Sequence, residues 1–253
     1  MRPAVRPGPL PGLRLGAPPR ATGFTLIEVL LALALGLLLV GSLVSGVIAH
    51  IGEQRRLLAQ ARLSQDLRAV MDLASRDLRR AGHWGQAERG APAEPGRQPE
   101  PNPYTGLHPA AGATAAALGH AYSRDAEENG VVDANERFGL RLNGNTGALE
   151  WRVSGTALAP GSGDQWQALT DPALLRVTEL EIRHEADRVD LLAQCPSDHC
   201  ADPADPDCPP RLLIHRVTLT IEASDVRDPT VRRRLRNTLR LRNEELQGVC
   251  PAL

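Results

Sequence analysis

The feature that most constrains this chain is an apolar run that begins at Leu26 and continues to Ile51. Its only ionisable side chains are Glu28 and His50. A helix needs about 20 residues, at about 1.5 Å each, to cross the roughly 30 Å hydrocarbon core of a bilayer, so the run is long enough to span a membrane. An acid within such a segment costs about 2.5–3.5 kcal/mol at a helix centre and therefore indicates a functional role.

Two simpler explanations of the apolar run account for fewer of its residues. A secretory signal peptide has an apolar region of about 7–15 residues that ends at a cleavage site between small residues. This run is longer, and it continues without a turn signal into a charged helical segment. A plain signal anchor requires neither the acid at position 28 nor Gly23 ahead of the run. The pattern predicts a membrane-spanning helix whose first residues have a role of their own.

Those first residues, Gly23-Phe24-Thr25-Leu26-Ile27-Glu28, resemble the processing motif of type IV prepilins and of type II secretion pseudopilins. In that family the prepilin peptidase, a membrane aspartyl enzyme, cuts after the glycine and methylates the new terminal amine. The resemblance implies cleavage between Gly23 and Phe24, N-methylation of Phe24 and an assembly role for Glu28. The new ammonium group is a cation in an apolar setting, where the Glu28 carboxylate of a neighbouring subunit is the natural counter-charge.

The helical pattern continues beyond the apolar run. No proline occurs between Phe24 and Ala91, and Gly82 and Gly85 supply an end signal, so we expect one helix from about Phe24 to about Ala81. Apolar residues at three- and four-residue spacing give its second half a single buried stripe. They are Leu63, Leu67, Val70, Met71, Ala74, Leu78 and Ala81.

The end of that helix resembles one group within the pilin family. Residues 77–85, with the sequence DLRRAGHWG, are similar to the segment that closes the long helix in minor pilins of the PilW type, and residues 238–243 resemble the last strand of those proteins. The family often has cysteine after this Trp-Gly, but Gln86 stands there instead, which puts the family's disulfide arrangement in doubt. J-type pseudopilins of type II secretion also have a long helix that ends in an Arg-Asp-Leu-Arg stretch, so they stay an alternative.

The rest of the chain predicts an α+β fold in which the long helix packs on an antiparallel β-sheet. Apolar and polar residues alternate around Leu140, Trp151 and Leu219, and residues 143–147 have the composition of a hairpin turn. The expected organisation is a leader at 1–23, the transmembrane and periplasmic halves of the helix at 24–51 and 52–81, a loop-rich region at 82–135, and a β-sheet domain with a cysteine-containing loop at 136–253.

The cellular compartment determines how the four cysteines are interpreted. The leader contains arginines and no acid, which favours a cytoplasmic amino end and places everything after the helix in the periplasm or outside the cell. Disulfides persist there, so they are preferred over a zinc site that includes His199, and their pairing stays open. The candidates are Cys195, Cys200, Cys208 and Cys250.

An acidic loop at residues 125–136 has the ligand spacing of an EF-hand calcium site. The spacing places a glycine at the sixth position, where the loop turns sharply, and a backbone carbonyl at the seventh. Glu127 replaces the commoner Asp or Asn, and no convincing helices flank the loop, so a solvated acidic turn is the alternative. The candidate Ca²⁺ ligands are Asp125, Glu127, Asn129, Val131, Asp133 and Glu136.

Composition argues against nucleic-acid binding and against catalysis. The formal net charge is -1, and the one dense basic stretch, residues 232–236, has no interleaved aromatic residues on which bases could stack. We interpret that stretch as a solvated turn or a subunit contact. The sequence shows no activated nucleophile, no phosphate-binding glycine loop and no pair of catalytic carboxylates. The chain is therefore expected to be a substrate of an enzyme, the prepilin peptidase, and no enzyme itself.

Together these features predict a minor type IV pilin of the PilW kind. Such a protein crosses the inner membrane once, keeps its C-terminal domain in the periplasm, is cut by prepilin peptidase, and joins other minor pilins and pilus subunits when assembly of the surface pilus starts. Gly36, Gly41 and Gly46 would let neighbouring helices approach closely. The alternatives are a J-type pseudopilin and a membrane-anchored, calcium-dependent adhesion module.

Overall fold

A single long helix, α1 (Leu26–Leu78), begins two residues after Phe24 and continues for 53 residues. The computed structural model describes residues 23–90, 100–195, 200, 208–248 and 250. Except for Gly23, the expected leader lies outside the described residues, as does His199. The chain divides into two compact units, Met1–Gly52 and Glu53–Leu253, and α1 contributes to both.

The first unit contains the apolar part of α1. Among the described residues, α1 is the one helix that is long and apolar enough to cross a membrane. Every residue from Gly23 to Gly52 is exposed within the chain, including its large apolar side chains. An apolar surface of this extent is unfavourable in water, so it requires lipid or other apolar helices around it.

The second part of α1 buries one stripe of side chains, as the periodicity predicts. The residues of this stripe form one hydrophobic core with apolar side chains of the two sheets, which include Leu140, Leu180 and Leu219. The faces beside the stripe carry exposed charged residues such as Asp72 and Arg76. The buried apolar members of the stripe are Leu63, Leu67, Val70, Met71, Ala74 and Leu78.

The helix ends at Leu78, before the predicted end at Ala81. The N–H groups of Arg80 and Ala81 bond to carbonyls only three residues back, at 2.8 and 3.1 Å, which tightens the last turn. Gly82 then adopts a φ of 74°, in the left-handed region that glycine reaches without strain. Ala81 is still buried, so the stripe continues through this turn.

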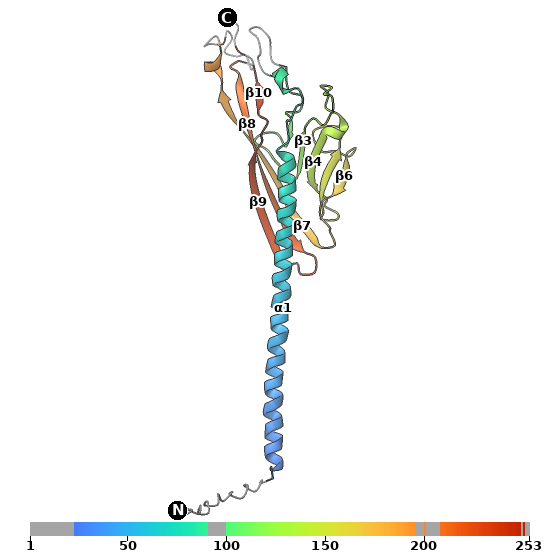
Figure 1. Cartoon of the computed structure of the whole chain (residues 1–253), viewed down its shortest axis with the longest axis vertical. Helices are drawn as coiled ribbons and strands as arrows, with labels where there is room; N and C mark the ends of the chain where they lie inside the picture. The colour runs from blue at the N-terminus through green and yellow to red at the C-terminus, as the bar shows by residue number, and fades with distance from the viewer. Residues whose placement is uncertain (1–22, 91–99, 196–199, 201–207, 249, 251–253) are drawn as a thin grey trace, which may run out of the picture. The chain divides into compact units, whose positions relative to one another are not determined.

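Two antiparallel five-stranded sheets make up most of the second unit (Figure 1). Sheet A has the order β1-β3-β4-β5-β6; its strands are β1 (Leu107–His108), β3 (Ala117–Ala121), β4 (Arg137–Leu142), β5 (Leu149–Ser154) and β6 (Gln165–Ala168). Sheet B has the order β10-β8-β7-β2, and β9 also pairs with β8; its strands are β2 (Thr114–Ala115), β7 (Leu175–Asp190), β8 (Arg211–Asp225), β9 (Arg232–Arg240) and β10 (Glu245–Gln247). Three short 3-10 helices complete the described elements: η1 (Ala87–Gly90), η2 (Ala134–Glu136) and η3 (Leu192–Gln194).

These elements confirm the predicted α+β fold. The longest pairing joins β7 to β8, from Leu175 opposite Asp225 to Asp190 opposite Arg211. In β8 Leu219 is fully buried in the core that includes α1. The alternate residues Thr218 and Thr220 are outside this core but are buried as well, so both faces of the strand are covered here. The first part of β8 pairs with β10 and its later part with β9, so one strand joins most of sheet B.

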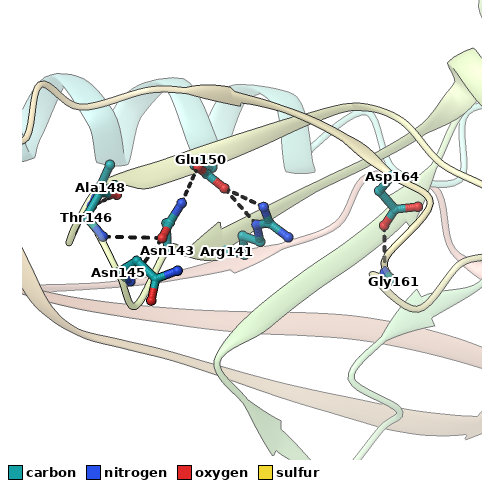
Figure 2. A network of polar contacts seen from close by, with 8 residues as sticks. All are labelled: Arg141, Asn143, Asn145, Thr146, Ala148, Glu150, Gly161 and Asp164. Atoms are coloured by element: carbon teal, nitrogen blue, oxygen red, sulfur yellow. Dashed lines mark hydrogen bonds and ion pairs between the residues drawn. The ribbon is translucent and has the colours of Figure 1, made fainter.

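The hairpin turn predicted at residues 143–147 joins β4 to β5 (Figure 2). The side-chain oxygen of Asn143 accepts hydrogen bonds from the backbone N–H groups of Asn145 at 3.0 Å and Thr146 at 3.3 Å. The Asn143 amide donates to Glu150 at 2.7 Å, and Arg141 donates to the other oxygen of that carboxylate, also at 2.7 Å. The turn is thus held by the side chains at the ends of both strands.

The region 82–135, which is expected to be rich in loops, also contains the short strands β1, β2 and β3. The first two strands have two residues each, too few to show an alternating pattern. The third includes Gly119, a residue of low strand propensity. Glycine is required at position 119, because a Cβ there would lie 2.1 Å from the carbonyl oxygen of Leu158. Residues 91–99 of this region lie outside the described part of the chain.

A buried ion pair holds the long connection between β5 and β6. Arg152 Nη2 lies 2.9 Å from Asp164 Oδ1, and both side chains are fully buried. The guanidinium also donates to the carbonyl oxygens of Leu158 at 2.9 Å and of Ala157. Asp164 accepts a hydrogen bond from the backbone N–H of Gly161 at 2.7 Å (Figure 2). Either charge left alone at this depth would be strongly unfavourable.

We expect Asp164→Asn to lower the free energy of unfolding by about 3–5 kcal/mol, because Arg152 then keeps a buried charge without a counter-charge. The matched control, Asp187→Asn, removes a half-exposed carboxylate that pairs with Arg216 at 2.6 Å and should cost at most about 1 kcal/mol. Chemical denaturation of the full-length protein in detergent measures both values. Equal effects would contradict the structural role of the buried pair.

Candidate functional site

The amino-terminal motif is arranged as a helix cap. Because α1 begins at Leu26, Thr25 is its N-cap and Glu28 is the third helical residue. Glu28 Oε2 accepts hydrogen bonds from the backbone N–H and the hydroxyl of Thr25, both at 2.9 Å. The N–H of Glu28 donates in return to the Thr25 hydroxyl oxygen at 3.4 Å. This reciprocal pattern is a capping box, and the Thr-x-x-Glu spacing ahead of an apolar run was a signal for Thr25 that the sequence analysis missed.

The predicted cleavage bond is accessible. Gly23 and Phe24 both precede the helix, and Phe24 is 86 % exposed. A Cβ built on Gly23 meets no atom within 4 Å. No contact within the described chain therefore protects the peptide bond between these two residues.

The segment at residues 77–85 attaches the end of α1 to sheet A. Asp77 accepts a hydrogen bond from the hydroxyl of Tyr122 at 2.9 Å and lies 2.7 Å from Nε2 of the fully buried His120. Arg80 lies over the Tyr122 ring, 4.3 Å from its centroid. Burial, and then the Asp77 charge, raise the pKa of Tyr122, so its hydroxyl stays a donor. The residues that carry the PilW resemblance thus have a structural role, and His120 and Tyr122 had no sequence signal.

Three of the six predicted calcium ligands converge. Oxygen atoms of Asp125, Asp133 and Glu136 lie within 4.8 Å of one another. Glu136 is fully buried and accepts the backbone N–H groups of Arg124 at 2.7 Å and of Asp133 at 2.9 Å. Asp125 Oδ2 is buried with no hydrogen-bond partner. Burial raises the pKa of Asp125, and the charges of Glu136 and Asp133 raise it further, as expected where carboxylates lie close together.

Of the other three predicted ligands, Asn129 contacts this group, because its amide nitrogen donates to Asp133 at 3.1 Å. Asn129 Oδ1 accepts the N–H of Val131 at 2.6 Å, and the Val131 carbonyl accepts a hydrogen bond from Tyr104 at 3.4 Å. Glu127 is exposed. Gly130 has a φ of 75°, which fits the sharp turn expected at the sixth position. The loop therefore brings three of the predicted carboxylates together, and the six-ligand set stays a prediction.

The four cysteines form two disulfides. Cys195 pairs with Cys250, and Cys200 pairs with Cys208. The first bond ties the end of the chain to the segment after β7, and the second closes a short loop before β8. All four thiols are consumed in this way, so none is left to bind zinc.

The basic stretch at residues 232–236 lies in β9, so the expected solvated turn was wrong. The pleat of the strand separates its arginines. Arg233 donates to Ser64 at 3.2 Å and to Gln60 at 3.1 Å, both on α1. Arg234, on the other face, pairs with Glu179 at 3.3 Å. These arginines make contacts within the domain.

Two protein-family models match this chain. The family model described as prepilin peptidase-dependent protein B matches residues 56–241. The chain belongs to this family. The model described as the prokaryotic N-terminal methylation motif matches residues 18–44, which include the predicted cleavage site and Glu28. Neither a curated protein nor a solved structure gives a significant match.

As a prepilin peptidase-dependent protein B family member, the chain is a pilin-like protein with a methylation motif. The predicted resemblance to type IV pilins is confirmed at this level. Pilin-like families are structural proteins, in agreement with the role of most polar contacts here in joining parts of the domain. The apolar part of α1, together with the methylation motif, indicates a membrane anchor followed by a C-terminal domain.

We expect Asp77→Ala to lower the free energy of unfolding by about 2–3 kcal/mol, because it leaves buried polar groups of His120 and Tyr122 without their partner. Asp72→Ala is a matched control on the same helix, since Asp72 is exposed; it should change stability by no more than about 0.5 kcal/mol. Thermal or chemical unfolding of the full-length protein measures both. A similar loss in the two variants would show that the Asp77 contacts do not hold the helix end.

Proposed function

We propose that this chain is a minor pilin of the PilW kind. Removal of residues 1–23 and methylation of Phe24 give a mature subunit that crosses the inner membrane once, with its domain in the periplasm. This subunit joins other minor pilins in a complex that starts assembly of the surface pilus. The observation that carries the proposal is the presence in one chain of the methylation motif over residues 18–44 and of the prepilin peptidase-dependent family over residues 56–241.

In this proposal Glu28 is the polar group that docks one subunit beside another. Before cleavage, the N–H and hydroxyl of Thr25 hydrogen-bond to its carboxylate, which reduces the cost of a charge in an apolar segment. Cleavage creates an ammonium at Phe24, the residue before the cap. When the Glu28 carboxylate of one subunit pairs with the Phe24 ammonium of the next, both charges are neutralised. This ion pair also sets the stagger between the two helices.

The helix glycines support close packing in the same assembly. A Cβ built at Gly36, Gly41 or Gly46 meets no atom within 4 Å, so nothing inside the chain accounts for glycine at these positions. Small residues let neighbouring membrane helices approach each other closely. A tolerated glycine in a membrane span is the simpler alternative for each position.

A J-type pseudopilin of type II secretion is the second candidate. It shares the long helix, the processing motif and the stretch at the end of α1, so the geometry of the helix does not separate it from a minor pilin. Genes for secretion next to this one, in place of pilus genes, would favour it.

The proposal predicts that, in cells with an active prepilin peptidase, the purified protein begins at Phe24 and carries one N-methyl group. Mass spectrometry of the amino-terminal peptide measures this directly. The variant Glu28→Ala should still be cut but should lose co-purification with the other minor pilins, because the new ammonium then lacks its counter-charge.

Glu53→Ala is the matched control, since Glu53 lies just beyond the apolar run of the same helix. It should be processed and should co-purify as the wild type does. A mature protein that begins upstream of Phe24 contradicts the processing role. Normal co-purification of Glu28→Ala contradicts the docking role.

We also propose that the carboxylates of Asp125, Asp133 and Glu136 bind Ca²⁺. The supporting observations are their convergence and the buried oxygen of Asp125 that has no hydrogen-bond partner. Ca²⁺ prefers carboxylate and carbonyl oxygens, and sites with few ligands in extracellular modules bind with dissociation constants of about 10⁻⁴–10⁻³ M. The ion would connect the segment before η2 to η2 itself.

We expect 10 mM Ca²⁺ to stabilise the protein by about 1.4 kcal/mol if the dissociation constant is about 1 mM. Asp133→Asn should abolish this gain, whereas Asp187→Asn, which changes a carboxylate outside the loop, should keep it. Thermal unfolding with and without Ca²⁺ measures the shift. An unchanged melting temperature in the wild type would exclude the site, and ligand binding that needs Ca²⁺ but survives Glu28→Ala would favour the adhesion alternative.

A further inference from the structure

Two buried histidines and a glutamate form a row across sheet B that the proposed assembly does not use. His184 on β7 is 3 % exposed and His215 on β8 is 6 % exposed. His184 Nδ1 lies 2.8 Å from the carbonyl oxygen of Pro109, and its Nε2 lies 2.9 Å from His215 Nδ1. His215 Nε2 lies 3.3 Å from Glu245 Oε2 on β10. The row therefore joins the segment at residues 105–112, which contains β1, to the middle of sheet B and to its last strand, β10.

The acceptors in the row determine how many ring protons it holds. The Pro109 carbonyl can only accept, so Nδ1 of His184 carries a proton. One proton lies between the two rings, because two lone pairs or two N–H groups would repel at 2.9 Å. His215 Nε2 faces a carboxylate, which favours a proton there as well. The contact between His215 Nε2 and Glu245 Oε2 is an ion pair and not an aligned hydrogen bond. The complete row thus carries one proton more than two neutral imidazoles.

The row cannot bind a further proton without repulsion. That proton would place the Nε2–H of His184 against the Nδ1–H of His215 at 2.9 Å. The other charged groups that line the adjoining cavity are Glu185 and Arg188, both from β7, and Glu185 is paired with Arg183 at 3.0 Å. The lining residues from the segment 105–112, which contains β1, are uncharged. In the described part of the chain, Glu245 is thus the carboxylate in contact with the rings, and it is already balanced by the first proton.

The sign of the pH dependence follows from these contacts. Burial lowers the pKa of His184 below its ordinary value of 6.5, and the charge of His215 lowers it further. In the unfolded chain both histidines take up protons below about pH 6.5. For the second proton, the unfolded state then binds a proton that the folded row refuses, so the contribution of His184 to stability is complete above that pH and falls as the pH drops below it. The contact with His215 lowers the pKa of Glu245, so this carboxylate remains charged through the same range.

We propose that the row is an acid-sensitive latch. One shared proton closes it, and a second proton, taken up in mildly acidic surroundings, separates His184 from His215. His184 can leave only by releasing the Pro109 carbonyl, which loosens the segment at residues 105–112. β10 has only three residues paired with β8, so it is the other element that loosens. Together with β7 and β8, these two elements line a pocket of about 510 Å³, which widens when the latch is released.

Hydrogen–deuterium exchange of the full-length protein in detergent tests this latch at pH 7.5 and pH 5.5. After correction for the intrinsic pH dependence of exchange, peptides that cover residues 105–115 and 241–248 should lose protection by up to about tenfold at the lower pH, since the uptake of one proton changes an equilibrium by at most tenfold per pH unit. Peptides from the buried part of α1 should not change. Protection that is the same at both values would overturn the proposal.

Variants assign the effect to the row. His215→Gln should remove the pH dependence, because the amide does not titrate and can flip so that its oxygen accepts a hydrogen bond from the Nε2–H of protonated His184. His184→Gln should do the same from the other side, so one folded variant is sufficient. The matched control is His83→Gln, since His83 is exposed; it should behave as the wild type does. Retention of the full pH response in both row variants would show that other groups cause it.

Nitrogen NMR of histidine-labelled wild-type protein provides a test that needs no variant. Nε2 of His184 should stay unprotonated, or share its proton with His215, until the pH falls clearly below 6.5. Independent protonation of both rings near pH 6.5 would contradict a shared proton.

Discussion

The contact on which this domain depends is the stripe that the second part of α1 buries against two sheets. Leu67 and Leu78 are fully buried in the same core as Leu140 of sheet A and Leu219 of sheet B. A sheet with one apolar face needs a cover, and a helix with one apolar stripe needs a surface to bury it. One helix meets both needs, because it satisfies its own backbone hydrogen bonds and presents side chains to both sheets at once.

The same helix has to be stable in two environments, and its sequence changes accordingly. Up to Gly52 its side chains are apolar on all faces and exposed within the chain, as suits lipid. From Leu63 onward only one stripe is apolar and buried. The single acid of the first part, Glu28, accepts hydrogen bonds from Thr25. Its charge therefore has partners within the chain and stays available for the proposed assembly. Propensity, capping and hydrophobic pattern therefore agree along its whole length.

Polar groups that lie inside the domain connect its separate parts. Asp77 joins the helix end to Tyr122, and Arg152 with Asp164 closes the connection between β5 and β6. His184 with His215 joins the two longest strands. A buried charge is tolerated when it is paired and hydrogen-bonded, so these contacts favour one arrangement of the sheets over others. The histidine pair differs from the other contacts because two imidazole rings lie in direct contact.

The sequence alone determined what depends on local pattern: the apolar span, the motif from Gly23 to Glu28, the stripe from Leu63 to Leu78 and the turn at Asn143. Each of these is read from residues close together in the chain, where periodicity and capping have direct physical meaning. Only the tertiary structure decided the pairing of Cys195 with Cys250, the place of β3 within sheet A and the meeting of His184, His215 and Glu245. These depend on contacts between residues far apart in sequence, and no local pattern encodes which distant strands become neighbours.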